Sequence, residues 1–318
     1  MAKAIERDIK GAELFYIGSR AGLESELVPR AGIRFESVSV GKFRRYFSLT
    51  NFLDLFRIPL GIFSAWLKIG RIKPDLVFSK GGFVSFPVVV AAWLRDVPIL
   101  THESDAILGL ATRLIAPFAE KVLLGWDIPL GKKFVYVGNP VRNEILKGRA
   151  RRALSVCGFD GKRPVLLAMG GSTGSKQLNE IILREKIALE KHYDIVHITG
   201  EGKGRLRREK HYYSVPYMHE EIKDFFALAS LALSRAGANA LSELETLQIP
   251  TLLYPLGLAG SRGDQIANAG ALAARSKLFL IANPKKSALE QLLKLPKRPA
   301  GHKENHAAER IVGIIKSL

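Results

Sequence analysis

The sequence predicts an α/β fold made of two Rossmann-like halves. Short apolar segments alternate with helical patterns along the whole chain, which is typical of parallel sheets covered by helices on both faces. Several of these segments are followed by turns rich in glycine and other small residues. The length of 318 residues and a hydrophobic content of 47% are sufficient for two packed cores.

The predicted strands are short and apolar, and helical patterns separate most of them. In the first half of the chain we expect strands at 14–18, 34–40, 75–80, 98–103, 121–126 and 134–138. In the second half we expect them at 164–169, 194–199, 212–217, 231–234, 250–254 and 277–281. Each half then has about the size of one Rossmann-like unit.

A basic stretch separates the two halves. We expect an N-terminal domain over 1–142, a linker with a short helix over 143–163, and a C-terminal domain over 164–318. The last helix is a candidate to pack back on the N-terminal domain. Ligands of such folds bind beyond the carboxyl ends of the strands, so the cleft between the halves is the expected site. The first half opens with a helical pattern at 2–10 instead of a strand and a Gly-rich turn, so we expect its first βα unit to be missing.

Composition limits the partners. No apolar run is long enough for a transmembrane helix, and the first residues have no signal-peptide core. The single cysteine, Cys157, excludes an internal disulfide and fits a reducing compartment. The net charge of +18 indicates attraction to an anionic partner, but it does not choose among nucleic acid, membrane and phosphorylated substrate. We find no nucleic-acid motif and no metal-ligand spacing, and we expect no cofactor.

Two clusters of small residues point to a nucleotide site. Gly-Gly-Ser-Thr-Gly-Ser at 170–175 and Arg-Ala-Gly-Ala-Asn-Ala-Leu-Ser-Glu at 235–243 each follow a predicted strand and open a helical pattern. Such turns bring backbone N–H groups and a helix N-terminus close to a phosphate. Ser172 is a candidate phosphate ligand, and Glu243 is a candidate to bind ribose hydroxyls. The plainer interpretations are a tight turn with an ordinary helix cap and a solvated glutamate.

Other polar groups follow predicted strands. Glu103 and Asp105 come at the end of the strand at 98–103 and are candidates for a general base. Arg142 follows the strand at 134–138 and is a candidate to bind pyrophosphate. Gln265 lies in a polar segment whose side chains suit sugar hydroxyls. Structural roles, such as caps and polar loops, remain the alternatives.

Residues 42–73 interleave aromatic and aliphatic side chains with seven basic residues and one acidic residue, Asp54. This pattern suits the surface of an anionic membrane, where apolar groups enter the bilayer and basic groups meet the headgroups. A loop followed by an amphipathic helix that faces the core is the alternative. The sequence leaves both interpretations open.

Taken together, these motifs resemble the MurG family. The resemblance rests on Gly-Gly-Phe-Val-Ser at 81–85, His-Glu-Ser-Asp at 102–105, Gly-Asn-Pro-Val-Arg at 138–142, Gly-Gly-Ser-x-Gly at 170–174, Ala-Gly-Ala-Asn-Ala-Leu-Ser-Glu at 236–243 and Asp-Gln at 264–265. It implies a GT-B fold, with two Rossmann-like domains facing a cleft. The implied activity is inverting transfer of N-acetylglucosamine (GlcNAc) from UDP-GlcNAc to the C4 hydroxyl of undecaprenyl-pyrophosphoryl-MurNAc-pentapeptide, in peptidoglycan synthesis for the cell wall.

The resemblance also implies roles for single residues and a location at the cytoplasmic face of the membrane, as a peripheral protein. The implied substrate-binding residues are Asp105, Arg142, Ser172, Met218, Ala238, Asn239, Ala240, Leu241, Ser242, Glu243 and Gln265. Met218 would lie beside the uracil, Glu243 on the ribose and Gln265 on the sugar. Asp105 stands where the family usually has Asn. The family's first Gly-rich loop, Gly-Gly-Thr-x-Gly-His, has no counterpart before residue 12.

Two alternatives stay open at this point. One is another glycolipid glycosyltransferase of the same fold, such as one that uses diacylglycerol. The other is a catalytically impaired homologue that binds a UDP-sugar without transferring it, which the missing first loop motivates.

Overall fold

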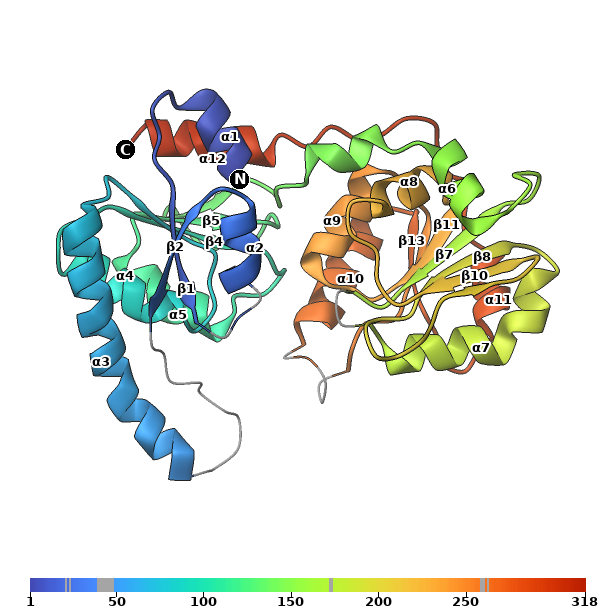
Figure 1. The fold of residues 1–318 in the computed structure, drawn as a ribbon, viewed down its shortest axis with the longest axis horizontal. Helices are drawn as coiled ribbons and strands as arrows, with labels where there is room; N and C mark the ends of the chain where they lie inside the picture. Colours follow the sequence, from blue (N-terminus) through green and yellow to red (C-terminus); the bar gives the residue numbers. More distant parts are fainter. Residues whose placement is uncertain (21, 23, 39–48, 172–173, 258–260, 262) are drawn as a thin grey trace. The chain divides into compact units, whose positions relative to one another are not determined.

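The chain folds into two compact units, drawn in Figure 1. The computed structural model describes residues 1–318 except 21, 23, 39–48, 172–173, 258–260 and 262, and only the backbone of 49–57. Unit 1 comprises residues 1–104, 108–139 and 306–318, and unit 2 comprises 105–107 and 140–305. Parallel strands alternate with helices in both, so the predicted α/β class is confirmed.

The strands of unit 1 form two separate parallel sheets. The two-stranded sheet pairs β1 (Phe15–Ser19) with β2 (Arg34–Val38). The four-stranded sheet has the order β3 (Val77–Ser79), β4 (Ile99–Glu103), β5 (Lys121–Leu124), β6 (Phe134–Tyr136). All five residues of β4 are buried, as expected for a central parallel strand that is covered on both faces.

Helices cover both faces of the four-stranded sheet. Neighbouring residues on β4 point to opposite faces. Ile99 packs with residues of α3 (Leu49–Ile72) and α4 (Ser85–Trp93), whereas Leu100 packs with Ile311 of α12 (Ala307–Lys316). The remaining helices of this unit are α1 (Ala2–Asp8), which lies beside α12, α2 (Glu24–Arg30), α5 (Leu110–Ile115) and the 3-10 turn η1 (Ala116–Phe118).

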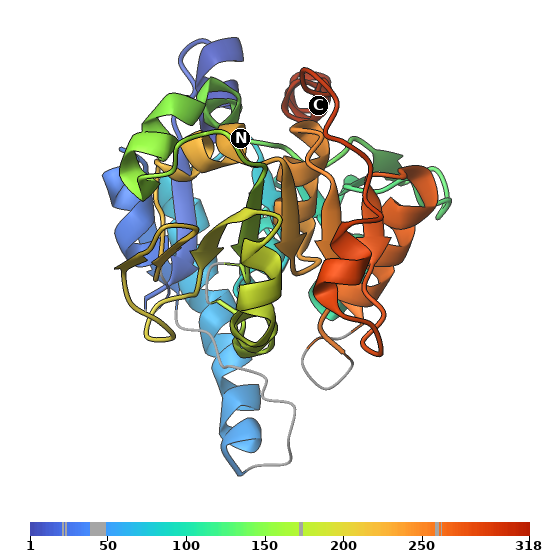
Figure 2. The ribbon, with the colours of Figure 1, turned by 90° about the vertical axis from the view of Figure 1, so that its right-hand side faces the viewer.

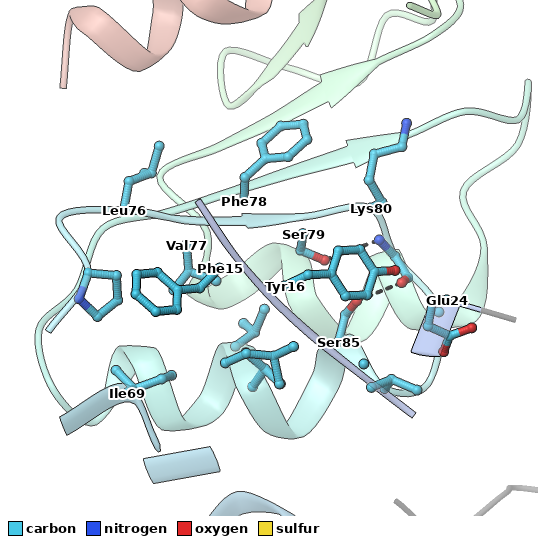
Figure 3. Close-up of a pocket in the computed structure, with 18 of the residues that line it drawn as sticks. Phe15, Tyr16, Glu24, Ile69, Leu76, Val77, Phe78, Ser79, Lys80 and Ser85 are labelled. Carbon is cyan, nitrogen blue, oxygen red and sulfur yellow. Dashed lines mark hydrogen bonds between the residues drawn. The ribbon is translucent and has the colours of Figure 1, made fainter. Parts of the chain in front are cut away.

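A cavity of about 380 Å³ lies in unit 1 between β1 and the segment that runs from β3 into α4. Phe15 and Tyr16 of β1 line this space, and Figure 3 shows Leu76 and Phe78 pointing to the side of β3 opposite to Val77. In the described residues β1 does not pair with β3, so the two sheets of unit 1 remain separate.

Unit 2 contains one seven-stranded sheet, which Figure 2 presents to the viewer. Its order is β13 (Phe279–Ile281), β12 (Thr251–Leu253), β11 (Leu231–Ser234), β7 (Val165–Met169), β8 (Asp194–Ile198), β10 (Tyr212–Val215), β9 (Arg207–Arg208). All pairs are parallel except β9 with β10. The sequence did not predict β9, whose two residues are exposed arginines without an apolar pattern.

The helices of unit 2 are α7 (Lys176–Glu190), α8 (Ile222–Leu228), α9 (Ala238–Thr246), α10 (Asp264–Arg275) and α11 (Ala288–Leu292). One core lies between the sheet and α7 and α11, with Leu166, Leu178 and Leu292 among its buried residues. The segment expected to be a linker forms the 3-10 turn η2 (Asn143–Lys147) and α6 (Ala150–Cys157), both of which pack on α8.

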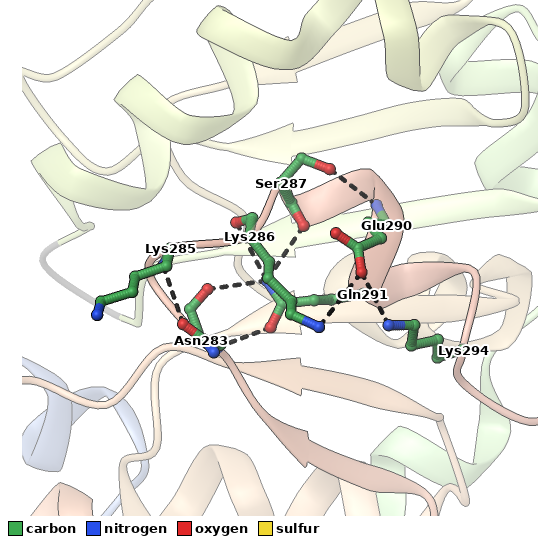
Figure 4. A network of polar contacts seen from close by, with 7 residues as sticks. All are labelled: Asn283, Lys285, Lys286, Ser287, Glu290, Gln291 and Lys294. Atoms are coloured by element: carbon green, nitrogen blue, oxygen red, sulfur yellow. Dashed lines mark hydrogen bonds and ion pairs between the residues drawn. The ribbon is translucent and has the colours of Figure 1, made fainter.

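A polar network holds the loop between β13 and α11 (Figure 4). The buried amide of Gln291 donates to the carbonyls of Asn283, Lys286 and Ser287 at 3.1–3.3 Å, and its oxygen accepts from Asn283 N–H at 2.6 Å. Ser287 caps α11 by accepting from Glu290 N–H at 3.0 Å. Every polar atom of the buried amide thus has a partner.

Candidate functional site

The two small-residue clusters meet at one edge of the unit 2 sheet. β7 lies between β8 and β11, and the chain continues to β8 and β10 on one side but to β12 and β13 on the other. The loops that follow β7 and β11 therefore leave in opposite directions, which is where open α/β sheets form a ligand crevice. Met169 pairs with Ser234, so Gly170 and Arg235 follow side by side.

The loop after β7 needs its glycines for close backbone approach. A Cβ on Gly170 would lie 2.3 Å from Ser175 N, and one on Gly174 would lie 2.3 Å from Thr199 O. Gly174 also has a φ of +68°. Ser175 begins α7 as its cap, since its Oγ accepts from Leu178 N–H at 3.2 Å. The candidate Ser172 lies outside the described residues.

The turn after β11 leaves the N-terminus of α9 open. The cap position is Gly237, so no side chain caps the helix at this position. A Cβ built on Gly237 would meet no atom within 4 Å. Space beside the first N–H groups of a helix suits an anionic group.

The candidates within α9 differ in what they offer. The side chains of Ala238 and Leu241 are buried, Ala240 and Ser242 are half-buried, and Asn239 is exposed. Ser242 Oγ donates back to Ala238 O at 2.9 Å. A ligand at this turn thus meets backbone groups of the first turn and the side chain of Asn239.

Glu243 and Arg142 form an ion pair inside unit 2. Arg142 donates to Glu243 Oε1 from Nε at 3.1 Å and from Nη2 at 2.8 Å. The side chain of Glu243 is 17% exposed and that of Arg142 is 61% exposed. The two residues predicted to bind ribose and pyrophosphate therefore lie next to each other.

The first turns of α10 hold two neighbouring segments. Gln265 Oε1 accepts from Leu256 N–H at 3.0 Å, which fixes the loop after β12. Asn268, which is fully buried, donates from Nδ2 to Asp105 Oδ1 at 2.9 Å and to Ala236 O at 3.2 Å. Its Oδ1 accepts from Ala106 N–H at 2.7 Å. Asn268 thereby brings Asp105 close to the turn that begins α9.

The other candidate base, Glu103, occupies a different position. Its side chain is buried, and its Oε2 accepts from Gly109 N–H at 2.9 Å and from Thr112 Oγ1 at 2.5 Å. These bonds cap the N-terminus of α5, where a carboxylate is favourable. The geometry gives Glu103 a structural role in unit 1.

His102, next to Glu103, is also a buried group. Its Nε2 donates to Gly138 O at 2.9 Å, which leaves Nδ1 to accept from Lys80 Nζ at 2.8 Å. Burial, with the charge of Lys80 as the second cause, lowers the pKa of His102 to about 4. The ring is therefore neutral at physiological pH.

Met218 lies in the loop between β10 and α8, with its side chain buried. Within the described residues, its backbone N–H and C=O make no hydrogen bond to another protein group. Its neighbours in the sequence, Tyr217 and His219, have their ring centroids 4.8 Å apart. The backbone N–H and C=O of Met218 thus have no hydrogen-bond partner among the described residues.

The sequence motifs indicate no role for Arg235, which lies in the cluster at 235–243, or for Asn268, which follows the Asp-Gln pair at 264–265. The signal for Arg235 is its place directly after a strand, at the sheet edge where ligands of this fold class bind. Among the residues that the structure describes, no group of three or more His, Cys, Asp or Glu is arranged to hold a metal ion.

The basic and aromatic segment 42–73 is described in part. Residues 42–48 and the side chains of 49–57 lie outside the described residues. In the second half of α3, Leu60, Phe63 and Leu67 are 65%, 59% and 51% exposed, and their spacing places them on one face of the helix. No helix in the described part of the chain has the length and apolarity needed to span a membrane.

Comparisons with known proteins agree on the family. The model of the glycosyltransferase family 28 N-terminal domain matches residues 1–124, and that of the family 28 C-terminal domain matches residues 165–316. A protein of Geobacillus kaustophilus, named UDP-N-acetylglucosamine--N-acetylmuramyl-(pentapeptide) pyrophosphoryl-undecaprenol N-acetylglucosamine transferase, is 47% identical over 268 residues. The match covers 81% of this chain and 74% of that protein.

A protein of the same name from Legionella pneumophila is 44% identical over 269 residues, which are 82% of this chain and 74% of that protein. The crystal structure of MurG from Acinetobacter baumannii has the same fold, with a TM-score of 0.71 at 22% identity. That likeness covers 100% of this chain and 94% of the other. The chain therefore belongs to glycosyltransferase family 28, and within it to the MurG family, which confirms the resemblance and the GT-B fold expected from the motifs.

Proposed function

We propose that this chain transfers GlcNAc from UDP-GlcNAc to the C4 hydroxyl of undecaprenyl-pyrophosphoryl-MurNAc-pentapeptide, a step of peptidoglycan synthesis. The observation that carries the proposal is the meeting of two Gly-containing turns at the switch point of unit 2, next to the Arg142–Glu243 pair. The names of relatives at 43–47% identity supply the substrates.

The donor fits the chemistry of this edge. Its diphosphate would lie against the loop at 170–175, where Ser172 stands, and against the open N-terminus of α9 over 238–242. Its ribose hydroxyls would bind Glu243, while Arg142 would turn to a phosphate oxygen. The Arg142–Glu243 pair keeps both charges compensated in the free protein, and the donor would replace each partner with a group of matching chemistry.

The remaining donor contacts follow from the same geometry. The backbone of Met218 would bind the uracil. Gln265 uses its oxygen to hold Leu256 N–H, which leaves its NH₂ group to donate to the GlcNAc hydroxyls.

The transfer step needs a base for the acceptor hydroxyl. The C4 oxygen would attack C1 of GlcNAc, its proton would pass to a carboxylate, and UDP would leave with inversion at C1. Asp105 is the better candidate, because it is half-buried and lies beside the α9 turn, whereas the carboxylate of Glu103 is committed to capping α5. Backbone N–H groups and Arg142 would meet the charge of the departing UDP without a metal.

We also place the protein on the cytoplasmic face of the cell membrane, as a peripheral protein attached through residues 42–73. The exposed apolar face of α3 supports this, together with the nearby basic residues Arg71 and Lys73. The formal charge of +18 favours anionic lipid.

The donor site is tested with Glu243→Ala and the matched control Glu245→Ala. Glu245 lies on the same helix but pairs with Arg275 and Lys303. We expect the wild type to bind UDP-GlcNAc in calorimetry and Glu243→Ala to bind it about 10- to 100-fold more weakly, as for lost hydrogen bonds to a charged group. Glu245→Ala should bind like the wild type. Retained affinity in Glu243→Ala would exclude this donor site.

The acceptor is tested by transfer assays with both lipids. Transfer to the muramoyl lipid supports the proposal. Transfer to diacylglycerol alone would favour a different glycolipid glycosyltransferase, and donor binding without any transfer would favour a non-catalytic homologue.

Membrane attachment is tested by sedimentation with vesicles that contain anionic phospholipid. Phe63→Ser should release the protein, whereas Ile187→Ser, at a 78% exposed position on α7 of unit 2, should not. Equal release by both changes would contradict the assignment to α3.

A further inference from the structure

A guanidinium group is buried at the switch point of unit 2. Arg235 is the first residue after β11, and only 7% of it is exposed. In the part of the chain that the structure describes, no carboxylate lies within ion-pair distance of it. Burying a charge without a counter-charge is unfavourable unless other groups solvate it, so its position needs an explanation.

Three hydrogen bonds of Arg235 reach three different segments. Nε donates to Ser175 Oγ at 3.0 Å, at the end of the Gly-rich loop that follows β7. Nη1 donates to Gln177 Oε1 at 3.0 Å in the first turn of α7, and to Tyr254 O at 2.9 Å, directly after β12. One side chain therefore joins the loops that follow β7, β11 and β12.

The second amino group of the guanidinium, Nη2, makes no hydrogen bond to any described residue. Burial lowers the pKa of Arg235, but a guanidinium stays protonated in proteins. The switch point thus carries a fixed positive charge, and one amino group of that guanidinium has no acceptor among the described residues.

We propose that Arg235 is a positioning residue of the donor site. It holds the Gly-rich loop against α9 and β12, and its uncompensated charge makes the site prefer a nucleoside diphosphate to the uncharged nucleoside. This inference rests on the proposed function, since it assumes that a UDP-sugar binds at the switch point. Its distinctive consequence is a change in the ratio of two affinities, for UDP and for uridine.

The experiment measures both affinities by calorimetry in the wild type and in Arg235→Gln. We expect UDP affinity to fall about 10- to 100-fold and uridine affinity to change by less than about threefold, because only UDP brings charge to the loop. The UDP affinity of Arg235→Lys should lie between those of the wild type and Arg235→Gln, since lysine keeps the charge but not the planar set of donors. Gln177→Leu, at an exposed position, removes one anchor and should lower the UDP-to-uridine affinity ratio about threefold.

Arg298→Gln is the matched control. Arg298 is a second guanidinium of unit 2 whose pKa burial lowers, but it donates to the carbonyls of Phe226, Ala229 and Leu247 at the ends of α8 and α9. Its replacement should lower Tm and leave the UDP-to-uridine ratio unchanged.

The possible results distinguish a failure of the proposed function from a failure of the role of Arg235. A wild type that binds neither UDP nor UDP-GlcNAc would overturn the proposed function, and this inference with it. A wild type that binds UDP, with an Arg235→Gln variant that keeps its affinity or loses UDP and uridine equally, would overturn the inference alone. If Arg235→Gln does not fold, an unchanged affinity ratio in Gln177→Leu overturns it.

Discussion

The two units share an α/β layering but differ in the continuity of their sheets. In unit 2 a single seven-stranded sheet carries strands β7, β8 and β11, whose residues are all buried. In unit 1 the strands form a pair and a separate set of four, with a cavity of about 380 Å³ beside β1. A site that needs backbone atoms fixed to a few tenths of an ångström is better supported by the continuous sheet. The hydrogen bonds by which Arg235 joins neighbouring loops lie in unit 2.

The buried histidines of the two units also differ in their partners. In unit 2, Asn179 donates to Thr199 O, His197 Nε2 donates to Asn179 Oδ1, and Tyr212 OH donates to His197 Nδ1, all at 2.8–2.9 Å. This chain of bonds joins α7, β8 and β10, and it satisfies each member. In unit 1 the buried His102 instead accepts from a charged amine, that of Lys80.

The largest expected effect comes from adding one methyl group to the loop after β7. Gly174→Ala would place Cβ 2.3 Å from Thr199 O at a φ of +68°. We expect it to lower the free energy of unfolding of unit 2 by about 4 kcal/mol, the sum of overpacking and left-handed strain. UDP binding should be lost in calorimetry at substrate concentrations that saturate the wild type.

Gly82→Ala is the matched change in unit 1. Gly82 has a φ of +85° and also follows a strand, but a Cβ there meets no atom within 4 Å. Only the conformational strain remains, about 1–2 kcal/mol. Equal losses in the two variants would mean that close contact in unit 2 is not what distinguishes the loops.

Acid should destabilise both units through their buried histidines. Burial lowers the pKa of His102 and of His197 from the usual 6.5 to about 4. Between pH 6.5 and 4 the unfolded chain binds a proton at each position and the folded chain does not, so stability present above pH 6.5 is lost as the pH falls toward 4. The loss amounts to about 3 kcal/mol for each histidine.

The two units have separate reporters for this measurement. Trp66, Trp93 and Trp126 are the three tryptophans of the chain and all lie in unit 1, whereas the single cysteine, Cys157, is buried in unit 2. We expect His102→Asn to flatten the pH dependence seen by tryptophan fluorescence and His197→Asn to flatten that seen by dithiodipyridine labelling of Cys157. An unchanged slope in either variant would assign the acid sensitivity to other groups.

Hydrogen exchange should show the difference in sheet continuity directly. A two-stranded sheet is marginal without further strands, so β1 and β2 should open more easily than β7 and β8. We expect their amides to exchange at least about tenfold faster, which corresponds to about 1.4 kcal/mol in opening free energy. The β4 amides of the same unit are the internal control. Equal protection of β1 and β7 would show that the two-stranded sheet opens no more easily than the seven-stranded one.

Much of the fold followed from the sequence. All twelve expected strands are present, since each is a short apolar run bounded by polar or glycine residues, which is a local signal. The two Gly-containing clusters were recognised for the same reason. That they lie on adjacent strands depends on strand order, a long-range property, and became visible only in the pairing of Met169 with Ser234.

The roles of single polar side chains followed less well. Glu103 and Asp105 stand two residues apart at the end of one strand, and the sequence did not distinguish them. Their difference comes from distant partners, because Thr112 of α5 binds one and Asn268 of α10 binds the other. Arg235 was overlooked for the same reason, since its three acceptors lie up to 60 residues away in the sequence.

The smallest expected effect concerns an ion-pair cluster of unit 1. Glu36 on β2 accepts from Lys68 and Arg71 of α3, each at 2.5 Å, and the hydrogen bond from Lys68 is the main cause that lowers the pKa of Glu36. Its side chain is 27% exposed, so solvent screens the pairs and Glu36→Gln should cost only about 0.5–1 kcal/mol, measured by denaturation followed through tryptophan fluorescence. The carboxylate stabilises the fold above its unfolded pKa and ceases to do so as the pH falls through the lower folded value. The loss of stability in Glu36→Gln should become smaller in high salt, because salt screens exposed charges. A loss of several kcal/mol that does not depend on salt would contradict this prediction and show that Glu36 ties β2 firmly to α3.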